Sequence, residues 1–497
     1  MADSNVSDET TGVKTAFDRR TFLKTAAATG AAPLLTGADG KRRNIVFVLV
    51  DDLRFDAMSF MNHPVIETPH IDAMARNGVH LKNAFVTTSL CSPSRASILT
   101  GLYAHKHQIL DNSTLMPEGA VTFPALLRKA GYRTGFVGKW HMGGSTDRPR
   151  PGFDRWVSFP GQGRYYDQTF NVDGGHEESK GYITDRITDY GVEFIEKNRD
   201  RPFFLYMSHK ATHAMFKPAE RHRGKYRNVT VPKPVSFADT EENYRGKPLW
   251  VKRQRITWHG VDAMYNHAIG FDEFYRSYCE TVLGVDDSVG RLMATLQKHG
   301  LDRDTLVILM GDNGFLFGEH GLIDKRCMYE PSIRVPMIAH CPSLTGSARA
   351  MDQLALNIDI APTILDAAGI PAPSSMHGRS FLPLLAGKRT DWRNGFLYEY
   401  FWERAFAQTP TVMGLRTDRY SFMRHHGVWD IYELYDIKSD PDQMNNLLGN
   451  ELPTAQAGDI LRHIQDPALK RLVNGLQDQL FSIIRETGGR IEPTWKG

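Results

Sequence analysis

The stretch NIVFVLV, residues 44–50, is a continuous run of mostly β-branched apolar side chains that ends in Asp51 and Asp52. A strand without a polar face is typical of a parallel sheet that is buried on both sides. The stretch DTLVILM, residues 304–310, repeats this pattern and ends in GDNG. Helices must cover both faces of such a sheet, so the two runs predict an α/β fold.

Two shorter apolar runs also lead into polar side chains. GYRTGFVGKWH leads into Lys139 and His141, and PFFLYMSHKATH leads into His209 and His213. Helical patterns separate the runs; TPHIDAMARNG, for example, starts with an N-cap threonine and a proline and stops at a glycine. Ligands of open α/β sheets bind at the carboxyl ends of the strands, so we expect these polar groups to meet at one edge.

Oxygen donors dominate the polar groups that follow the two long runs, namely Asp51, Asp52, Asp312 and Asn313. Each pair alone is a common turn or helix-cap sequence, but together the four favour a hard divalent cation, Ca²⁺ or Mg²⁺, over zinc. Three basic residues are expected around the ion, namely Arg95, Lys139 and Lys325. A site so rich in positive charge binds an anion.

The stretch TSLCSPSRASILTG, residues 88–101, places Cys91 at the predicted start of a helix. Pro93 suits the first helical turn, and backbone amides at a helix N-terminus favour negative charge. A thiolate nucleophile is one interpretation, and a buried structural cysteine is another. A nucleophilic thiolate is normally paired with a histidine and gains nothing from a hard cation, so thiol chemistry suits these surroundings poorly.

Composition narrows the partners and the compartment. The 497 residues carry a net charge of +3, which does not suggest a nucleic-acid partner, and the four cysteines form no CxxC pair or disulfide framework. Arg19 and Arg20 precede an FLK sequence and a run of small residues, which resembles a twin-arginine export signal. No later stretch reaches the ~20 apolar residues of a membrane span. We therefore expect export to the periplasm or medium.

CSPSRASILTG resembles the signature of type I sulfatases, Cys-x-Pro-Ser-Arg followed by Leu-Thr-Gly, and the resemblance extends over residues 44–450. It implies an alkaline-phosphatase-like α/β fold with a large mixed, mostly parallel sheet flanked by helices. A smaller C-terminal α+β subdomain should carry a short antiparallel sheet and a helix. The expected division is an export signal and tail at 1–38, a catalytic domain at 39–388 and the C-terminal subdomain at 389–497.

The resemblance also implies a cofactor set. In this family a separate maturation enzyme oxidises the signature cysteine to formylglycine, here at Cys91. One Ca²⁺ would be held by Asp51, Asp52, Cys91, Asp312 and Asn313. The motif arginine, Arg95, would steady the modified residue. The elements GKWHMG and DKRCMYEPSIRVP match the family segments that supply Lys139, His141 and Lys325.

One element departs from the family pattern. Sulfatases usually show Pro-His-x-Pro after the fourth strand, whereas this chain reads KATHAMF, with Thr212 and Ala214 where prolines are expected. His213 falls at the position of the family histidine. His209, four residues earlier, competes for the same role.

The resemblance implies that a hydroxyl of hydrated formylglycine attacks sulfur while the cation, Lys139 and Lys325 neutralise the sulfate oxygens. His213 would protonate the departing alcohol as general acid. His141 would help to deprotonate the second hydroxyl, which expels sulfate.

The substrate prediction depends on PGFDRWVSFPGQGRYYDQTFNVDG, residues 151–174, which resembles a segment of bacterial N-acetylglucosamine-6-sulfatases and mucin-desulfating sulfatases. It favours a 6-sulfated glucosamine or related hexose of a polysaccharide. Its candidate sugar contacts are Gln162, Arg164, Asp167 and Asn171.

Two other functions stay open. A phosphomonoester or phosphodiester hydrolase of the same superfamily would use a similar metal site, and His320 is the residue that could supply the histidine ligand of a two-zinc phosphatase. A noncatalytic sulfoglycan-binding protein would keep Cys91 unmodified.

The end of the chain predicts a long amphipathic helix. Asp466 is the expected cap, Pro467 the first helical residue and Gly488 the terminator. The expected apolar stripe consists of Leu469, Leu472, Leu476, Leu480 and Ile483.

Overall fold

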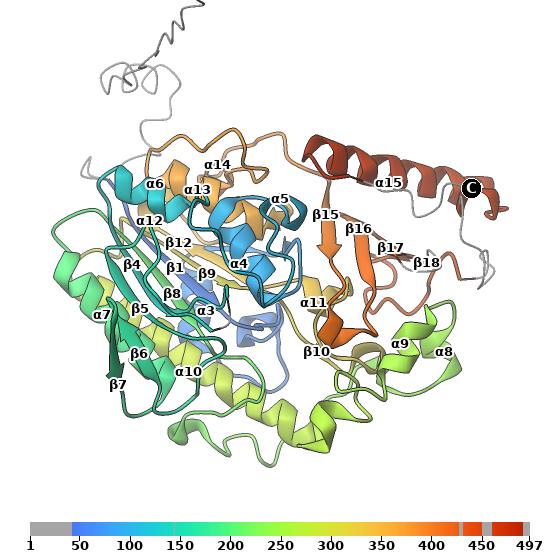
Figure 1. The fold of residues 1–497 in the computed structure, drawn as a ribbon, viewed down its shortest axis with the longest axis horizontal. Helices are drawn as coiled ribbons and strands as arrows, with labels where there is room; N and C mark the ends of the chain where they lie inside the picture. The colour runs from blue at the N-terminus through green and yellow to red at the C-terminus, as the bar shows by residue number, and fades with distance from the viewer. Residues whose placement is uncertain (1–41, 144, 427–430, 450–459, 491–497) are drawn as a thin grey trace, which may run out of the picture.

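The computed structural model describes residues 42–143, 145–426, 431–449 and 460–490, so the predicted export segment lies outside the described residues. A ten-stranded sheet forms the centre of the molecule (Figure 1). Its strands, in spatial order, are β13 (Arg349–Met351), β2 (Val79–Leu81), β12 (Met337–His340), β9 (Thr305–Gly311), β1 (Asn44–Val50), β8 (Phe203–His209), β4 (Arg133–Lys139), β5 (Arg155–Phe159), β6 (Thr169–Val172) and β7 (Gly175–Glu178).

The middle of this sheet is parallel. β1 pairs in parallel with β8 and β9, and β4 pairs in parallel with β8 and β5, whereas β12 and β6 run antiparallel to their neighbours. In β1, Val46 and Val48 belong to the core on one face, and Ile45 and Phe47 belong to the core on the other. The predicted strand over 44–50 is confirmed, and its lack of a polar face follows from burial on both sides.

Two layers of helices cover the sheet, as Figure 1 shows. One face packs against α3 (Pro69–Arg76), α7 (Ile183–Asn198) and α10 (Phe271–Lys298). The other face packs against α4 (Cys91–Thr100), α6 (Phe123–Lys129), α13 (Ile360–Ala367) and α14 (Leu382–Leu385). The predicted α/β class with a large, mostly parallel sheet is therefore confirmed.

A second, antiparallel sheet follows the large one in sequence. Its strands are β15 (Gly395–Tyr400), β16 (Thr411–Thr417), β17 (Tyr420–His426) and β18 (Ile431–Asp436). It packs against the large domain through the rings of Phe85 and Phe396, whose centroids lie 5.1 Å apart. The predicted boundary between residues 388 and 389 falls between α14 and β15, and the predicted antiparallel sheet is confirmed.

The predicted C-terminal helix is α15 (Pro467–Glu486). The Asp466 carboxylate caps it by accepting a hydrogen bond of 2.8 Å from the Ala468 amide. The stripe is rotated slightly from the predicted one, because Leu469, Leu472 and Ile483 are only partly buried. The buried side chains of the helix are Val473, Leu476, Leu480 and Ile484.

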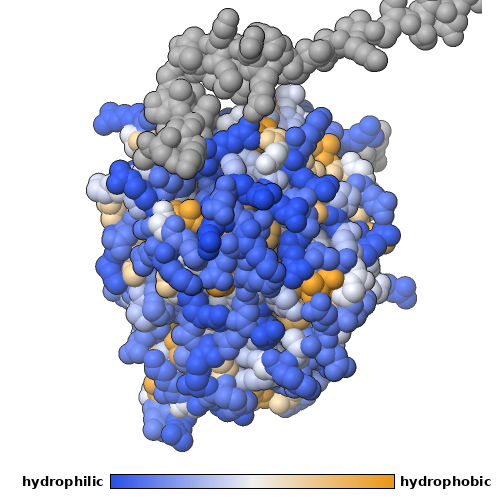
Figure 2. Space-filling view, turned by 90° about the vertical axis from the view of Figure 1, so that its left-hand side faces the viewer, coloured by the Kyte–Doolittle hydropathy of each residue, from blue (hydrophilic) through white to orange (hydrophobic). Residues whose placement is uncertain are grey.

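The surface in Figure 2 is mostly hydrophilic, with small apolar patches scattered over it. Among the residues that the structure describes, no helix combines the length and apolar character that a membrane span requires.

We expect Leu480→Ala in α15 to lower the free energy of unfolding by about 2–5 kcal/mol, because the side chain is fully buried against the antiparallel sheet. Denaturant unfolding measures this change. Arg471→Ala, on the exposed side of the same helix, is the control and should change stability by less than about 0.5 kcal/mol. Equal effects of the two substitutions would contradict the assigned orientation of α15.

Candidate active site

The carboxyl ends of β1 and β9 bring the predicted oxygen donors together. The Asp312 amide donates a hydrogen bond of 3.0 Å to the Val50 carbonyl, which extends the parallel pairing into the site. The Asp52 amide donates to Asp312 Oδ1 at 3.0 Å, and Asn313 Nδ2 donates to Asp52 Oδ1 at 2.7 Å. Carboxylate oxygens of Asp51, Asp52 and Asp312 all lie within 4.8 Å of one another.

These residues fit a hard divalent cation. Three carboxylates are fully buried together, an arrangement that costs free energy unless positive charge compensates it. Asp52 Oδ2 and Asn313 Oδ1 are buried oxygens without a hydrogen-bond partner in the described part of the chain. Unpaired carboxylate and amide oxygens are the ligands that Ca²⁺ and Mg²⁺ prefer.

The surrounding charges act differently on the two neighbouring aspartates. Burial alone would raise the pKa of Asp51, but the adjacent charge of Lys139 brings that pKa well below its usual value. Burial raises the pKa of Asp52 to about 7 against the opposing effect of Lys325, and the Asp51 and Asp312 carboxylates add to the increase. Additional positive charge at Asp52 would therefore favour its ionised form.

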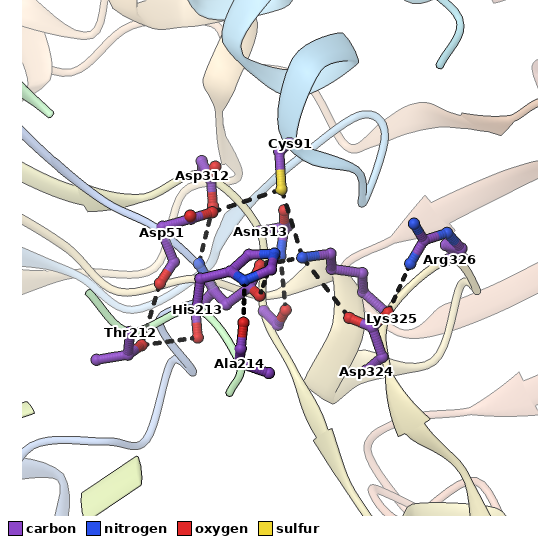
Figure 3. A network of polar contacts seen from close by, with 12 residues as sticks. Asp51, Cys91, Thr212, His213, Ala214, Asp312, Asn313, Asp324, Lys325 and Arg326 are labelled. Carbon is purple, nitrogen blue, oxygen red and sulfur yellow. Dashed lines mark hydrogen bonds and ion pairs between the residues drawn. The ribbon is translucent and has the colours of Figure 1, made fainter. Parts of the chain in front are cut away.

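Cys91 is the first residue of α4 and points from the helix end into this cluster, as Figure 3 shows. Its Sγ lies 3.4 Å from Asp51 Oδ1 and 3.4 Å from Lys325 Nζ. Burial, with a further contribution from Asp51, raises the pKa of the thiol far above its ordinary value. An unmodified Cys91 is therefore a neutral thiol here and a poor nucleophile.

Three buried cations surround the carboxylates. Arg95 Nε donates to Asp312 Oδ2 at 2.9 Å, and Arg95 Nη1 donates to the carbonyl of Lys139 at 2.6 Å. The ammonium groups of Lys139 and Lys325 donate to Asp51 and Asp52, respectively. Each predicted cation thus has a carboxylate partner within the site.

The structure separates the two histidines that competed for one role. His213 Nε2 lies 3.9 Å from Asp52 Oδ2, and its ring belongs with Asp51 and Cys91 in a second group of close ligand atoms (Figure 3). His209 points to the other side of the sheet, where its Nε2 lies 3.2 Å from Ser288 Oγ on α10. Only His213 is brought to the cysteine.

Neutral imidazoles are favoured at His213 and His141. Burial, reinforced by Lys139, lowers the pKa of each well below its usual value. His141 is buried after β4, and its carbonyl accepts a hydrogen bond from the Ser92 hydroxyl on α4. His141 Nδ1 has no hydrogen-bond partner in the described part of the chain and is free to accept a proton.

Thr212, at the departure from the family pattern, has a role that proline could not fill. Its hydroxyl donates to the carbonyl of Asp51 at 3.0 Å, and its amide donates to the same carbonyl at 2.6 Å. Proline has neither of these donors. The loop that carries His213 is thereby tied to the strand end that carries the aspartates.

The four predicted sugar contacts occupy different places. Gln162 Oε1 accepts a hydrogen bond of 2.5 Å from Lys139 Nζ, so Gln162 lies at the site. Gln162 and Arg164 line a hollow of about 570 Å³ beside it. Asp167 Oδ1 instead accepts from the Gly181 amide, and Asn171 Oδ1 from the Gly174 amide. The latter two side chains support loops and are not brought to the cysteine.

Two further residues bear on the predictions. Lys210 comes directly after β8 and is not among the predicted site residues, although its position at the end of a strand resembles that of Lys139. His320 is buried with its ring 4.2 Å from that of Tyr329, and it belongs to neither group of potential metal ligands among the described residues. It therefore adds no histidine to the oxygen-donor set.

Comparisons with known proteins agree with this geometry. The sulfatase family profile matches residues 43–370, a profile for the N-sulphoglucosamine sulphohydrolase C-terminal region matches residues 318–469, and a TAT pathway signal sequence matches residues 16–36. The chain therefore carries a twin-arginine export signal, as predicted.

Relatives match over most of the chain. It is 34% identical over 467 residues to an N-acetylglucosamine-6-O-sulfatase of Bacteroides thetaiotaomicron, covering 82% of this chain and 83% of the relative. It is 30% identical over 466 residues to the N-acetylglucosamine-6-sulfatase of Homo sapiens, covering 82% of each.

A solved structure extends the likeness to the fold. A protein in complex with its substrate, D-glucosamine-2-N,6-O-disulfate, superposes with a TM-score of 0.80 at 30% identity, covering 90% of this chain and 98% of that one. The long family match, the relatives and the arrangement of the site together show that this chain is an enzyme of the sulfatase family.

Proposed function

We propose that this sulfatase removes 6-O-sulfate from N-acetylglucosamine or a related hexose in a sulfated polysaccharide such as a glycosaminoglycan or mucin. The observation that carries the reaction is the placement of Cys91 at a helix N-terminus, between Asp51 and Lys325. The names of the relatives and the glucosamine disulfate bound to the structural neighbour support the choice of sugar.

We further propose that Cys91 is oxidised to formylglycine by a separate maturation enzyme. The buried thiol of Cys91 is a poor nucleophile as it stands, which supports this conversion. Hydrated formylglycine supplies a hydroxyl nucleophile, and a Ca²⁺ or Mg²⁺ ion supplies a positive charge that acidifies it. The residues that would hold the ion are Asp51, Asp52, residue 91, Asp312 and Asn313.

The remaining side chains have complementary roles in this proposal. Lys139 and Lys325 lie on two sides of the cluster and would balance the charge on the sulfate oxygens as the ester bond breaks. His213 is the group that would deliver a proton to the departing sugar oxygen, because the negative charge of a bound sulfate ester would favour its protonated form. His141, with an unpaired Nδ1, would accept a proton from position 91 when sulfate is released.

The substrate's sugar would lie in the hollow next to Gln162. This hollow adjoins the site because Gln162 both lines it and accepts a hydrogen bond from Lys139. Arg164 and His176 are polar groups of the same lining that sugar hydroxyls can contact. The TAT signal agrees with action on an extracytoplasmic polysaccharide.

The site geometry weakens the two alternative functions. A two-zinc phosphatase would need several histidine ligands, but His213 is the one histidine in the two groups of potential ligand atoms among the described residues, and His320 lies against Tyr329 instead. A noncatalytic binding protein would not need His213 as an acid, His141 as a base and a nucleophile at residue 91, all beside one cation site. We therefore propose hydrolysis of a sulfate ester.

Position 91 provides the test of the nucleophile. Protein produced with a maturation enzyme should yield a peptide carrying an aldehyde at residue 91, by mass spectrometry, and should release sulfate from N-acetylglucosamine-6-sulfate. Cys91→Ala should lose this activity, because no side-chain hydroxyl can form.

Substrate controls test the specificity in the same assay. We expect weaker activity on galactose-6-sulfate, and little or none on a 2-sulfated uronate or on N-acetylglucosamine-6-phosphate. Activity confined to the uronate would contradict the proposed sugar. A preference for the phosphate ester would contradict the proposed hydrolysis of a sulfate ester. Full turnover by Cys91→Ala would exclude residue 91 as the nucleophile.

Removal of the ion provides the test of the cation site. Chelation should abolish activity and lower the melting temperature, and Ca²⁺ should restore both, because an ion that binds only the folded protein stabilises it by about 2.7 kcal/mol at a hundred times its Kd. Asp52→Asn should remove the Ca²⁺-dependent rise in melting temperature.

Asp286→Asn is the matched control for the cation. Asp286 is also a buried aspartate, but its Oδ1 accepts a hydrogen bond of 2.8 Å from the Ile71 amide at the start of α3, on one face of the sheet. This variant should keep the Ca²⁺-dependent rise. Loss of the rise in both variants, or in neither, would argue against the ion site.

Substitution of His213 provides the test of the general acid. His213→Asn should lower kcat/KM for the sugar sulfate by about 10²–10⁴-fold, the usual contribution of a general acid. The loss should be much smaller for a nitrophenyl sulfate, because its weakly basic leaving group departs without a proton. His209→Asn is the control and should leave the ratio of the two kcat/KM values unchanged. Equal losses of His213→Asn on both esters would rule out proton donation by His213.

A further inference from the structure

Three lysines are buried in the described part of the chain, and all three lie at or beside the cluster of Asp51, Asp52 and Asp312. Lys139, Lys210 and Lys325 are 0%, 4% and 3% exposed, respectively. Lysine is almost never buried this completely unless an anion accompanies it. The partners of these three ammonium groups therefore indicate what each one does.

Two of the lysines have carboxylate partners within the protein. Lys139 Nζ pairs with Asp51, and Lys325 Nζ pairs with Asp52. Lys210 Nζ, by contrast, forms neither a hydrogen bond nor an ion pair with any described residue. Its one direct interaction is with the ring of Tyr165, whose centroid lies 4.4 Å from Nζ.

The backbone holds Lys210 beside the catalytic groups. Its carbonyl accepts a hydrogen bond of 3.0 Å from the His213 amide, and the next carbonyl, that of Ala211, accepts one of 3.0 Å from the Asp51 amide. The Tyr165 hydroxyl donates to the His213 carbonyl at 2.6 Å, so one tyrosine contacts both the ammonium and the histidine loop. Lys210 thus occupies the His213 side of the cluster.

Electrostatics agrees with this position. Burial lowers the pKa of Lys210 to about 8, with Lys139 adding to the decrease, while Asp51 and Asp52 oppose it. The group is therefore close enough to sense both aspartates although it is paired with neither. An ammonium that is buried without an anion costs free energy, and an anionic ligand would offset that cost.

We propose that Lys210 is a substrate-binding cation that contacts an oxygen of the ester sulfate on the side nearest His213. The inference rests on the proposed sulfate-ester hydrolysis and extends it by one residue. Lys139 and Lys325 are held by carboxylates, so Lys210 is the buried ammonium with its donors free. An ammonium at this place would hold the sulfate while the neighbouring His213 faces the departing sugar oxygen.

Inhibition by the two products tests this assignment. Inorganic sulfate and N-acetylglucosamine are the probes, and turnover of an aryl sulfate by matured, Ca²⁺-loaded protein is the readout. Lys210→Met should raise the Ki of sulfate and lower kcat/KM about tenfold to a hundredfold, the usual range for a lost hydrogen bond to a charged group. The Ki of N-acetylglucosamine should not change.

Matched variants separate binding from packing. Lys210→Arg should retain most of the sulfate affinity, and Lys210→Gln supplies a second neutral variant if Lys210→Met does not fold. Lys233→Met is the control, because Lys233 also lies over a ring, that of Phe237 at 4.9 Å, but is exposed to solvent. It should leave both Ki values unchanged.

Each other outcome overturns the proposal. An unchanged Ki of sulfate in a folded neutral variant would mean that Lys210 only packs against Tyr165. Equal changes in both Ki values would mean a general distortion of the site, and a change in the sugar Ki alone would place Lys210 on the sugar. These outcomes are independent of the substrate screen, because an aryl sulfate reports on sulfate binding even if the natural sugar is different.

Discussion

Mutual repulsion among Asp51, Asp52 and Asp312 is the constraint on which the rest of this site depends. The three carboxylates are fully buried within 4.8 Å of one another, so the fold must supply positive charge at the same place. Arg95, Lys139 and Lys325 supply it, each with a direct contact to one of the three. The cations come from α4, from the end of β4 and from the segment after β11 (Ile323–Asp324), so charge compensation joins distant parts of the chain.

The parallel sheet makes this concentration of charge possible. Its buried strands hold their ends in register, as the hydrogen bonds from Asp51 to Ala211 and from Asp312 to Val50 show. Apolar side chains pack on both faces of β1 up to the residue where the aspartates begin. A site that needs several groups within a few ångströms is best supported by such elements.

Much of this arrangement could be predicted because strand patterns and motifs are local in sequence. The run over 44–50, the N-terminal position of Cys91 in its helix and the Asp466 cap are all set by neighbouring residues. Tertiary contacts decided what the sequence left open. His209 ends β8 and His213 lies four residues later, and only packing turns the former towards Ser288 on α10. The sugar contact predicted for Asn171 stays a prediction, because its carboxamide bonds both to the Gly174 amide and to Asp147, which lines the hollow beside Gln162.

Charge balance explains why the overlooked lysine matters. The three carboxylates meet three partnered cations, so these six groups balance one another when all of them are ionised. A cation held by Asp52 and Asn313 and the ammonium of Lys210 would both add to this balance and leave the site positive. This excess of buried positive charge lowers the stability of the folded protein. It is complementary to the negative charge of a sulfate ester that binds from solvent. Lys210 was invisible to motif comparison because its unpaired ammonium is a property of the folded site and not of its neighbours in sequence.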